Sequence, residues 1–287
     1  MSSSFAGHGE PTHYDDVIAV EVTIDGMLVI ADRLQLEEFP PSLGIRPNIP
    51  QPELRDKVWD RVARDLTTQG VLDAIGKPHP EVAAMADTLS RSDRMLEGRW
   101  WRRDAGGKMA RFVVCRKGAR HVIAARDGDL LVLQRVAPQV GLAGMVTAVL
   151  GVAEPADVEP MTGVTSRLAE SRTPNQLAQF GIAPASARIY AEATGNPSSW
   201  VEITATERHS GGTFTRAGVA AGLLDSPQGR IVSIPRKVNG ELFGSFLPGT
   251  QDNLQRALDE LILFLPSGAW FEAKADTDYY YDYYDGD

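Results

Sequence analysis

Hydrophobic positions recur at the spacing of an α-helix in several parts of the chain. The clearest case lies between residues 51 and 70, where apolar residues stand four apart: Leu54, Val58, Val62 and Leu66. Pro52 near the start of this stretch and Gly70 after its end are typical helix boundaries. We expect further helices at residues 79–91 and 183–193, a buried one within residues 136–153, and a last one that Thr250 caps and Pro266 ends.

Short runs of β-branched and aromatic residues predict antiparallel strands, because turns that contain glycine separate them. These turns are the Gly-Gly pairs at 106 and 211 and the pairs Lys117-Gly118, Asp127-Gly128 and Asn239-Gly240. A further strand is expected to end at Gly26, and another at Gly163. The expected unit is a strand, a helix, at least one more helix, a three-stranded meander and a closing helix, which makes this an α+β protein.

One half of the chain can be laid over the other. Residues 21–45 match residues 158–182 at a constant offset of 137, and residues 127–131 match 239–243 at an offset of 112. Between them, residues 102–111 match 207–216 at an offset of 105, which places Arg111 on Arg216. Because the order is preserved through all three blocks, the sequence predicts an internal duplication in which two units share a sheet with quasi-two-fold symmetry.

The same comparison divides the chain. We expect a flexible leader at residues 1–16, a first α+β repeat at 17–153, a second at 154–270 and a disordered acidic tail at 271–287. The leader lacks the basic start and apolar core of a signal peptide. The tail holds five of the seven tyrosines together with five aspartates, a composition that cannot build a core.

Composition adds the broad class. A chain of 287 residues with 43% hydrophobic residues can bury a sizeable core, and a single cysteine excludes an intramolecular disulfide and indicates a reducing compartment such as the cytoplasm. The longest uncharged stretch, residues 136–153, contains proline, glutamine and several glycines. We therefore expect a buried helix there and no insertion into a membrane.

One stretch is strongly basic although the formal net charge of the chain is -9. Residues 99–127 hold nine Arg and Lys residues against two Asp. Solvated charge around a hairpin is the ordinary interpretation, and a protein partner is the next. Nucleic acid is disfavoured, because the matching second hairpin at residues 204–216 is much less basic. Trp100 and Trp101 must point to opposite faces of their strand, so one of them is available for an interface.

The search for chemistry gives no positive sign of an enzyme. The five histidines show no metal-ligand spacing, no nucleotide-binding loop is present, and Cys115 lies in an apolar run typical of a core strand. His209 and Ser210 fall in a Gly-Gly turn, where a catalytic pair would exist in one repeat only. We expect no catalytic residues, no metal and no cofactor. Five consecutive apolar residues at 261–265 cover all sides of a helix, which suggests core surface with some left for a partner.

Four segments carry a resemblance to a known family: "VEVTIDGMLVIADRL", "FPPSLGIRPNIPQPELRDKVWDRVARDL", "LEGRWWRRDAGGKMARFVVCRKGARHVIAARDGDLLVLQRVAPQVGLAGMVTAVLG" and "GELFGSFLPGTQDNLQRALDEL". They are similar to the EspG family of mycobacterial type VII (ESX) secretion, and most similar to the member of the virulence-associated ESX system. The resemblance runs from about residue 17 to 270 and leaves the leader and the tail uncovered.

The resemblance implies a cytosolic chaperone that binds its cognate PE/PPE heterodimer at the hydrophobic tip of the PPE protein, keeps it soluble and delivers it for export. It also implies a central antiparallel sheet with flanking helical bundles. By position, the family's binding surface includes the loop between the second and third strands, the second-half sheet and the C-terminal helices. The partner-binding candidates are therefore Arg102, Arg103, Lys108, Arg230, Arg236, Lys237, Gln255 and Asp259.

Two alternatives of other classes stay open at this point. A nucleic-acid or regulatory protein would use the basic hairpin 99–126, and its DNA binding would depend strongly on salt. A hydrolase would depend on His209 and Ser210. We expect no nucleic-acid partner, and the sequence leaves a homodimer of the free chain open.

Overall fold

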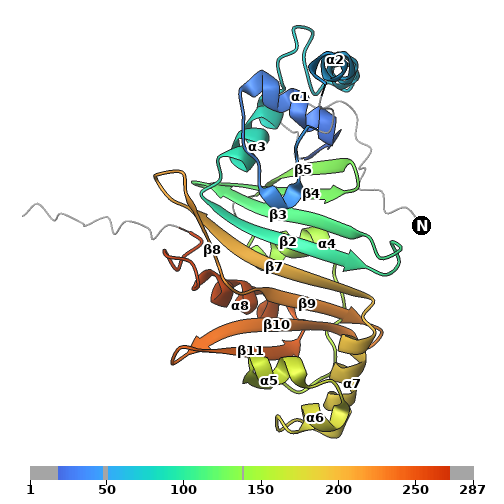
Figure 1. Ribbon diagram of the computed structural model, residues 1–287, viewed down its shortest axis with the longest axis vertical. Helices are drawn as coiled ribbons and strands as arrows, with labels where there is room; N and C mark the ends of the chain where they lie inside the picture. The colour runs from blue at the N-terminus through green and yellow to red at the C-terminus, as the bar shows by residue number, and fades with distance from the viewer. Residues whose placement is uncertain (1–18, 48–50, 138, 272–287) are drawn as a thin grey trace, which may run out of the picture.

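The fold is built on one antiparallel sheet. The computed structural model describes residues 19–47, 51–137 and 139–271, and the predicted leader and all but the first residue of the predicted tail lie outside them. Within these ranges eleven strands form a single sheet (Figure 1). The strands are β1 Ala19–Thr23, β2 Arg94–Arg102, β3 Met109–Lys117, β4 Arg120–Asp127, β5 Leu130–Val136, β6 Met161–Val164, β7 Ser199–Arg208, β8 Phe214–Arg216, β9 Ala221–Ser226, β10 Gly229–Val238 and β11 Glu241–Pro248.

The strand order reads the same from both edges of the sheet. The order is β1-β5-β4-β3-β2-β7-β9-β10-β11-β6, and β8 pairs with β7 beside it. Each half thus places its last meander strand next to its first strand, and β2 meets β7 at the centre. The offset of 105 relates Gly98 to Ile203, and these two residues are paired at the midpoint of the β2–β7 ladder. This order is the one a duplication predicts, while the common origin of the halves and the repeat boundaries stay predictions.

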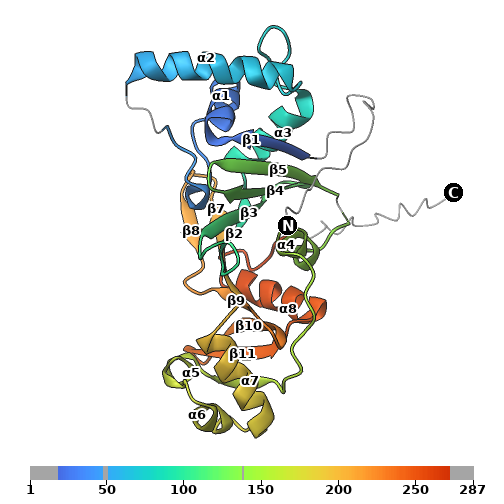
Figure 2. The same ribbon diagram turned by 90° about the vertical axis from the view of Figure 1, so that its right-hand side faces the viewer.

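The helices lie on the two faces of the sheet in a pattern that leaves part of one face open. On one face, α1 Ile24–Leu34, α2 Pro52–Thr68 and α3 Pro80–Ser90 lie over the first-half strands. At the other end of the same face lie α5 Thr165–Glu170, α6 Pro174–Ala178 and α7 Pro184–Gly195. The opposite face carries α4 Leu142–Leu150 and α8 Gln251–Ile262, side by side on the central core (Figure 2). The α+β fold with a central antiparallel sheet is therefore confirmed.

Three details of the expected unit are wrong. The first strand ends at Thr23, three residues before Gly26, because the Thr23 hydroxyl accepts a hydrogen bond from the Gly26 N–H and caps α1. The first meander has four strands, β2–β5, because each of its three glycine turns joins two of them. The last helix starts after Thr250 as expected but ends at Ile262, four residues before Pro266.

The second half interrupts a strand that is continuous in the first. Strand β3 runs along β2 without a break, whereas β8 and β9 share that position along β7. Residues 217–220 separate them, and the pairing register along β7 shifts by two residues across the gap, from Thr206↔Arg216 to Ile203↔Ala221. The extra residues leave the ladder as a bulge. This bulge becomes a wall of the site described below.

The segment after α8 is fastened to the ends of the central strands. Trp270 is 4% exposed, and its indole Nε1 donates a hydrogen bond to Nε2 of His121 at 3.0 Å. Arg116, itself paired with a carboxylate, donates to the Trp270 carbonyl oxygen, and Arg94 donates to the Ala269 carbonyl at 3.2 Å. We call these contacts the C-terminal latch, because they hold the chain against β2, β3 and β4 where it leaves the last helix.

The latch predicts a pH dependence of stability. An indole N–H can only donate, so His121 must accept at Nε2 and carry its proton at Nδ1, which makes the ring neutral. Burial lowers the pKa of His121, and the charge of Arg116 lowers it further, against a smaller opposite effect of Asp93 and the Ala119 backbone. A depressed pKa means that the unfolded chain binds a proton before the folded chain does, so this stability is present above about pH 6.5 and is lost as the pH falls.

We expect His121→Gln, which cannot take up this proton, to flatten the fall in the free energy of unfolding between pH 7 and pH 5. Urea denaturation followed by tryptophan fluorescence at several pH values measures the slope. Equal slopes in the parent chain and the variant would show that His121 does not titrate in this way.

A second prediction concerns Gly98 at the centre of the sheet. A Cβ atom at this position would lie 2.1 Å from the ring of Phe112, which is fully buried in the core. We expect Gly98→Ala to lower the free energy of unfolding by about 1–3 kcal/mol, and Phe112→Leu to return part of that loss in the double variant. Gly195→Ala is the matched control, because a Cβ there meets nothing within 4 Å. Similar values for the two alanine variants would contradict the packing argument.

Candidate partner-binding groove

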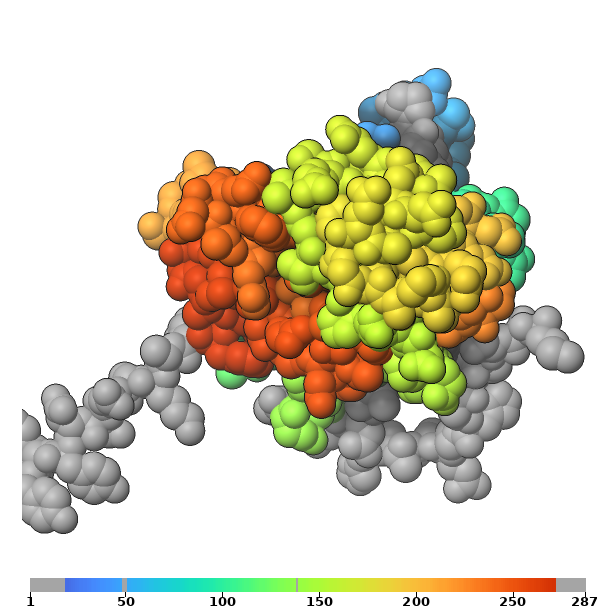
Figure 3. Space-filling view, turned by 90° about the horizontal axis from the view of Figure 1, so that it is seen from below, coloured from blue at the N-terminus to red at the C-terminus, as the bar shows by residue number. Residues whose placement is uncertain are grey.

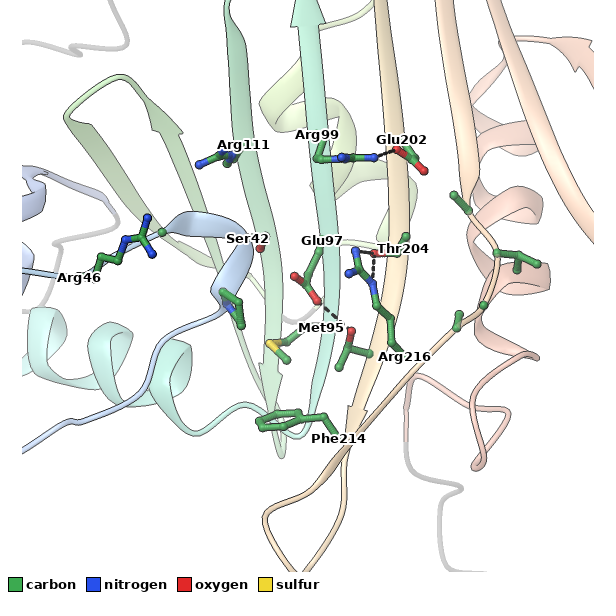
Figure 4. Close-up of a pocket in the computed structure, with 17 residues that line it drawn as sticks. Ser42, Arg46, Met95, Glu97, Arg99, Arg111, Glu202, Thr204, Phe214 and Arg216 are labelled. Carbon is green, nitrogen blue, oxygen red and sulfur yellow. Dashed lines mark hydrogen bonds and ion pairs between the residues drawn. The ribbon is translucent and has the colours of Figure 1, made fainter.

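A polar groove lies on the central part of the sheet face that the helices leave open. Its floor is formed by β2, β3 and β7, and its volume is about 1080 Å³. The segment around η1 (Pro41–Leu43), from the first half, forms one wall, and β8 with the bulge 217–220 forms the other. Figure 4 shows side chains of both halves converging on this floor. We call this site the central groove.

Arginine dominates the charge of the central groove. Arg46, Arg99, Arg111 and Arg216 line it together with two glutamates. Arg99 is paired with Glu202, and Arg216 donates to the Thr204 hydroxyl at 2.8 Å (Figure 4). Within the described ranges, neither Arg46 nor Arg111 forms an ion pair. The groove is therefore locally positive in a chain of net charge -9, which favours acidic or polar groups on whatever binds there.

Three arginines stand directly opposite one another across neighbouring strands. Arg99 is paired in register with Arg111, and Arg111 with Arg126. Like charges opposite one another destabilise a sheet unless each is compensated. Arg126 donates to the carbonyl oxygens of residues 43 and 44, which fixes the groove wall, and Arg99 has its glutamate. Among the described residues, Arg111 is thus the member of the row that has neither a carboxylate nor a backbone carbonyl as its partner, and its charge faces the groove.

A buried carboxylate lies at the base of the groove. Glu97 is only 7% exposed, and its Oε1 accepts a hydrogen bond from the Thr206 hydroxyl at 2.8 Å. Met95 lies beside it on the same face of β2, and Phe214 of β8 closes that end of the groove. The base therefore presents polar acceptors flanked by apolar surface.

An apolar pocket of about 300 Å³ adjoins the central groove. Residues 218–220 of the bulge line both, so the two recesses adjoin at this segment. The pocket is enclosed by α5, the end of α7 and strands β10 and β11, with Leu168, Tyr190, Phe243 and Phe246 in its lining. From below, Figure 3 shows the yellow helices α5–α7 beside the orange and red surface of β10, β11 and α8. A polar groove that leads into an apolar pocket suits an amphipathic protein surface.

The eight predicted partner-binding residues do not form one cluster. Arg102, Arg103 and Lys108 lie at the β2–β3 hairpin, at the opposite end of the strands from Arg236 and Lys237 (Figure 1). Arg102 is half-buried, since it pairs with Asp127 at 2.6 Å and lies over the Trp100 ring. Arg103 and Lys108 are exposed at the tip of the hairpin. Only these two of the three hairpin cations are therefore accessible.

The predicted partner-binding residues of the second half lie on different faces of the sheet. Lys237 is exposed beside the lining of the apolar pocket, on the same strand as Pro235. Arg236 points to the other face, where it pairs with Glu260 of α8. On that face Gln255 accepts from the Ala143 N–H at 3.0 Å and donates to Asp259, which joins α8 to the start of α4.

Arg230, a partner-binding candidate from the sequence, lies in the interior of the structure. The residue is 5% exposed, and its guanidinium binds both oxygens of Asp225 and the carbonyl of Gly151. A side chain enclosed in this way cannot reach a partner while the sheet is intact. Arg230 belongs to the framework that holds β9, β10 and the end of α4 together.

The basic stretch is largely neutralised by the fold itself. Besides the pairs of Arg99 and Arg102, Arg116 binds Asp93 at 2.7 Å and Lys117 binds Asp87 at 2.5 Å. Arg126 donates hydrogen bonds to the backbone carbonyl oxygens of residues 43 and 44. A nucleic-acid surface needs a continuous stripe of available cations, and most of these cations already have partners.

The chemical candidates of the sequence, Cys115 and the His209–Ser210 pair, have other contacts in the structure. Burial raises the pKa of Cys115 to about 12, so its thiol stays protonated at neutral pH and packs as a core side chain. His209 hydrogen-bonds to the Thr215 hydroxyl at 2.7 Å rather than to Ser210. Over the described ranges, no group of three or more His, Cys, Asp or Glu side chains could hold a metal ion.

In the same residues, no helix has the length and apolar character to cross a membrane.

The partner-binding residues predicted from the sequence do not include those of the central groove, although one pattern in the sequence indicated them. The offset of 105 places Arg111 on Arg216, and both line the central groove from the two sides of the sheet centre. Glu97 and Glu202 are related by the same offset. A duplication predicts that a site where the two halves meet collects matching residues of both, so charged positions that repeat at this offset were the usable signal.

Comparison with known proteins confirms the resemblance inferred from the sequence. The EspG family model matches residues 23–260. The chain is 66% identical over 283 residues to the ESX-1 secretion-associated protein EspG1 of Mycolicibacterium smegmatis, which covers 99% of this chain and 100% of that protein. It is 70% identical over 262 residues to the protein of the same name from Mycobacterium tuberculosis, with 91% and 93% covered.

A solved structure shares the fold. The Mycobacterium tuberculosis type VII secretion system chaperone EspG5, in complex with a PE25-PPE41 dimer, matches with a TM-score of 0.71. The sequence identity is 19%, and the match covers 88% of this chain and 98% of that one.

The division into framework and surface residues can be tested by stability. Arg230→Met leaves Asp225 without its partner in a largely buried position, so we expect the free energy of unfolding to fall by about 3 kcal/mol or more. Lys237→Met and Arg103→Met remove exposed charges and should change it by about 0.5 kcal/mol or less. Urea denaturation measures all three, and a small effect of Arg230→Met would restore that residue to the candidate surface.

Proposed function

This chain belongs to the EspG family, and from that membership we propose that it is a cytosolic chaperone specific for one PE/PPE heterodimer of an ESX secretion system. It binds the hydrophobic tip of the PPE protein, keeps the heterodimer soluble and delivers it for export. Its similarity to ESX-1 relatives supports a client of the ESX-1 system. The observation that carries the proposal is that the polar central groove and the apolar pocket adjoin at residues 218–220.

The apolar pocket supplies the shielding that a chaperone needs. An exposed apolar tip on a helical protein is an aggregation hazard, and covering it with Leu168, Phe243 and Phe246 removes that surface from water. Leu263 is a second apolar element, 64% exposed at the end of α8, whereas Leu261, Ile262 and Leu265 of the same run are buried. The run thus supplies mainly core, with one side chain left outside it.

The polar groove allows the chaperone to select its own client from those of other ESX systems. Arg111, Arg46 and the carboxylate of Glu97 can orient a client that offers groups of matching charge, while a client of another ESX system would leave these groups unpaired. Lys237 beside the pocket, and Arg103 and Lys108 at the hairpin, are further exposed cations that a client can contact. Release before export then needs only moderate affinity, because binding acts by mass action.

The decisive experiment co-expresses the full chain with PE/PPE pairs from different ESX loci, followed by pull-down and size-exclusion chromatography of the soluble fraction. We expect a stable one-to-one-to-one complex with one pair and none with the others. Failure with every pair, although the pairs are folded on their own, would reject the proposal.

Two matched pairs of variants locate the interface. Ala169→Trp fills the apolar pocket from an exposed position on α5, and Arg111→Glu reverses the unpaired charge of the groove. We expect each variant to weaken client binding at least about tenfold. The reason is that burying an unpaired charge or losing an apolar contact costs about 1.4 kcal/mol or more. Ser166→Trp and Arg188→Glu are the controls, because both residues are exposed and line neither recess. Isothermal titration with the identified client measures the change.

The hairpin is tested separately by Arg103→Glu with Lys108→Glu. Unchanged client affinity in this double variant would remove the hairpin from the interface. Unchanged affinity in Ala169→Trp and Arg111→Glu would remove the groove and the pocket.

A further inference from the structure

A second large cavity, remote from the central groove, lies between α3 and α4 at the ends of β4 and β5. Its volume is about 710 Å³, and it shares no lining residue with the central groove or the apolar pocket. Ala84 and Met85 of α3 line one side, and Val140, Met145 and Ala148 line the other. We call it the α3–α4 cavity.

The cavity has an apolar interior and a basic rim. Arg135 at the rim is paired with Glu81 at 2.8 Å, whereas Arg120 is exposed and forms no ion pair within the described ranges. His121 contributes its ring to the lining. Aromatic side chains with a polar tip, accompanied by carboxylates, are the chemistry that fits such a site.

The described chain ends beside this cavity. The Phe271 ring lies against the His121 ring with 5.5 Å between the centroids, and the latch holds Trp270 just before it. Whatever follows Phe271 therefore starts next to a residue that lines the cavity. The first tyrosine beyond this point, Tyr279, is eight residues away, and an extended chain of that length reaches about 27 Å.

The composition of residues 272–287 matches the cavity. The segment holds five tyrosines, six acidic residues and one lysine. Tyrosine supplies an apolar ring and a hydroxyl, and the neighbouring aspartates complement the unpaired Arg120 at the rim. The described chain also starts near the cavity, since Ala19 pairs with Gln134 of its lining, but residues 1–18 hold only two aromatic residues and three acidic ones.

We propose that the Tyr/Asp-rich carboxy-terminal segment, residues 272–287, docks into the α3–α4 cavity of its own chain. The tyrosine rings occupy the apolar interior, and the aspartates face Arg120. The docking site lies away from the central groove, so the segment covers apolar surface without competing with a client bound there.

Site-specific photo-crosslinking in the full chain tests this directly. Ala148, exposed at the cavity, is replaced by the photoreactive residue p-benzoylphenylalanine, and the products are identified by mass spectrometry. We expect crosslinks to residues 272–287 within one chain, running as a monomer on a denaturing gel. Val152, which is 90% exposed just beyond α4, is the matched control position and should give at most a tenth of that yield.

Charge reversal supplies the second arm. Arg120→Glu should reduce the crosslink yield at least fivefold, whereas Arg188→Glu on the distant helix α7 should leave it unchanged. Crosslinks to residues 1–18, crosslinks that join two chains, or no crosslink to residues 272–287 would each overturn the proposal. Because the cavity and the central groove share no residue, loss of this crosslink and loss of client binding are separate outcomes.

Discussion

The antiparallel pairing of β2 with β7 is the constraint on which the molecule depends. Nine residue pairs join the two halves there, from Arg94↔Glu207 to Arg102↔Ser199. Every other strand is added outward from this ladder, so its register decides which side chains of both halves share a face. Gly98 at its midpoint has no side chain because the Phe112 ring fills that space. A slip of one residue would move Glu97 and Arg99 into the core and expose Leu96.

The distribution of helices on this sheet creates the functional surface. The closing helices α4 and α8 cover one face at its centre, while the other two helix groups cover the opposite face only at its ends. The central strip of that face is therefore open, with polar side chains from both halves and an apolar pocket at one side. Where the first half continues one strand, the second inserts the bulge 217–220, which makes the two sides of the groove different. A framework whose strand order is symmetric thus presents an asymmetric surface.

The basic stretch illustrates how a local charge pattern misleads. In the sequence, nine cations between residues 99 and 127 suggest a binding surface. In the fold, neighbouring strands and helices bring Asp87, Asp93, Asp127 and Glu202 to four of them, and backbone carbonyls satisfy a fifth. What remains available is a small set: Arg111 in the groove, Arg103 and Lys108 at the hairpin, and Arg120 at the start of β4. Arg230 shows the same effect in its strongest form, since burial turns a surface candidate into a framework residue.

The sequence by itself determined the α+β class, the helices and glycine turns, the absence of a recognisable catalytic motif and the family resemblance. Each of these depends on residues close together in the chain or on similarity along its whole length. The tertiary structure alone decided which cations are free, that Arg230 is buried, and where the central groove lies. These properties depend on pairs such as Arg99 with Glu202 and Arg230 with Gly151, which are 103 and 79 residues apart. Local pattern carries no information about such distant neighbours, because the strand register that brings them together is set by the packing of the whole sheet.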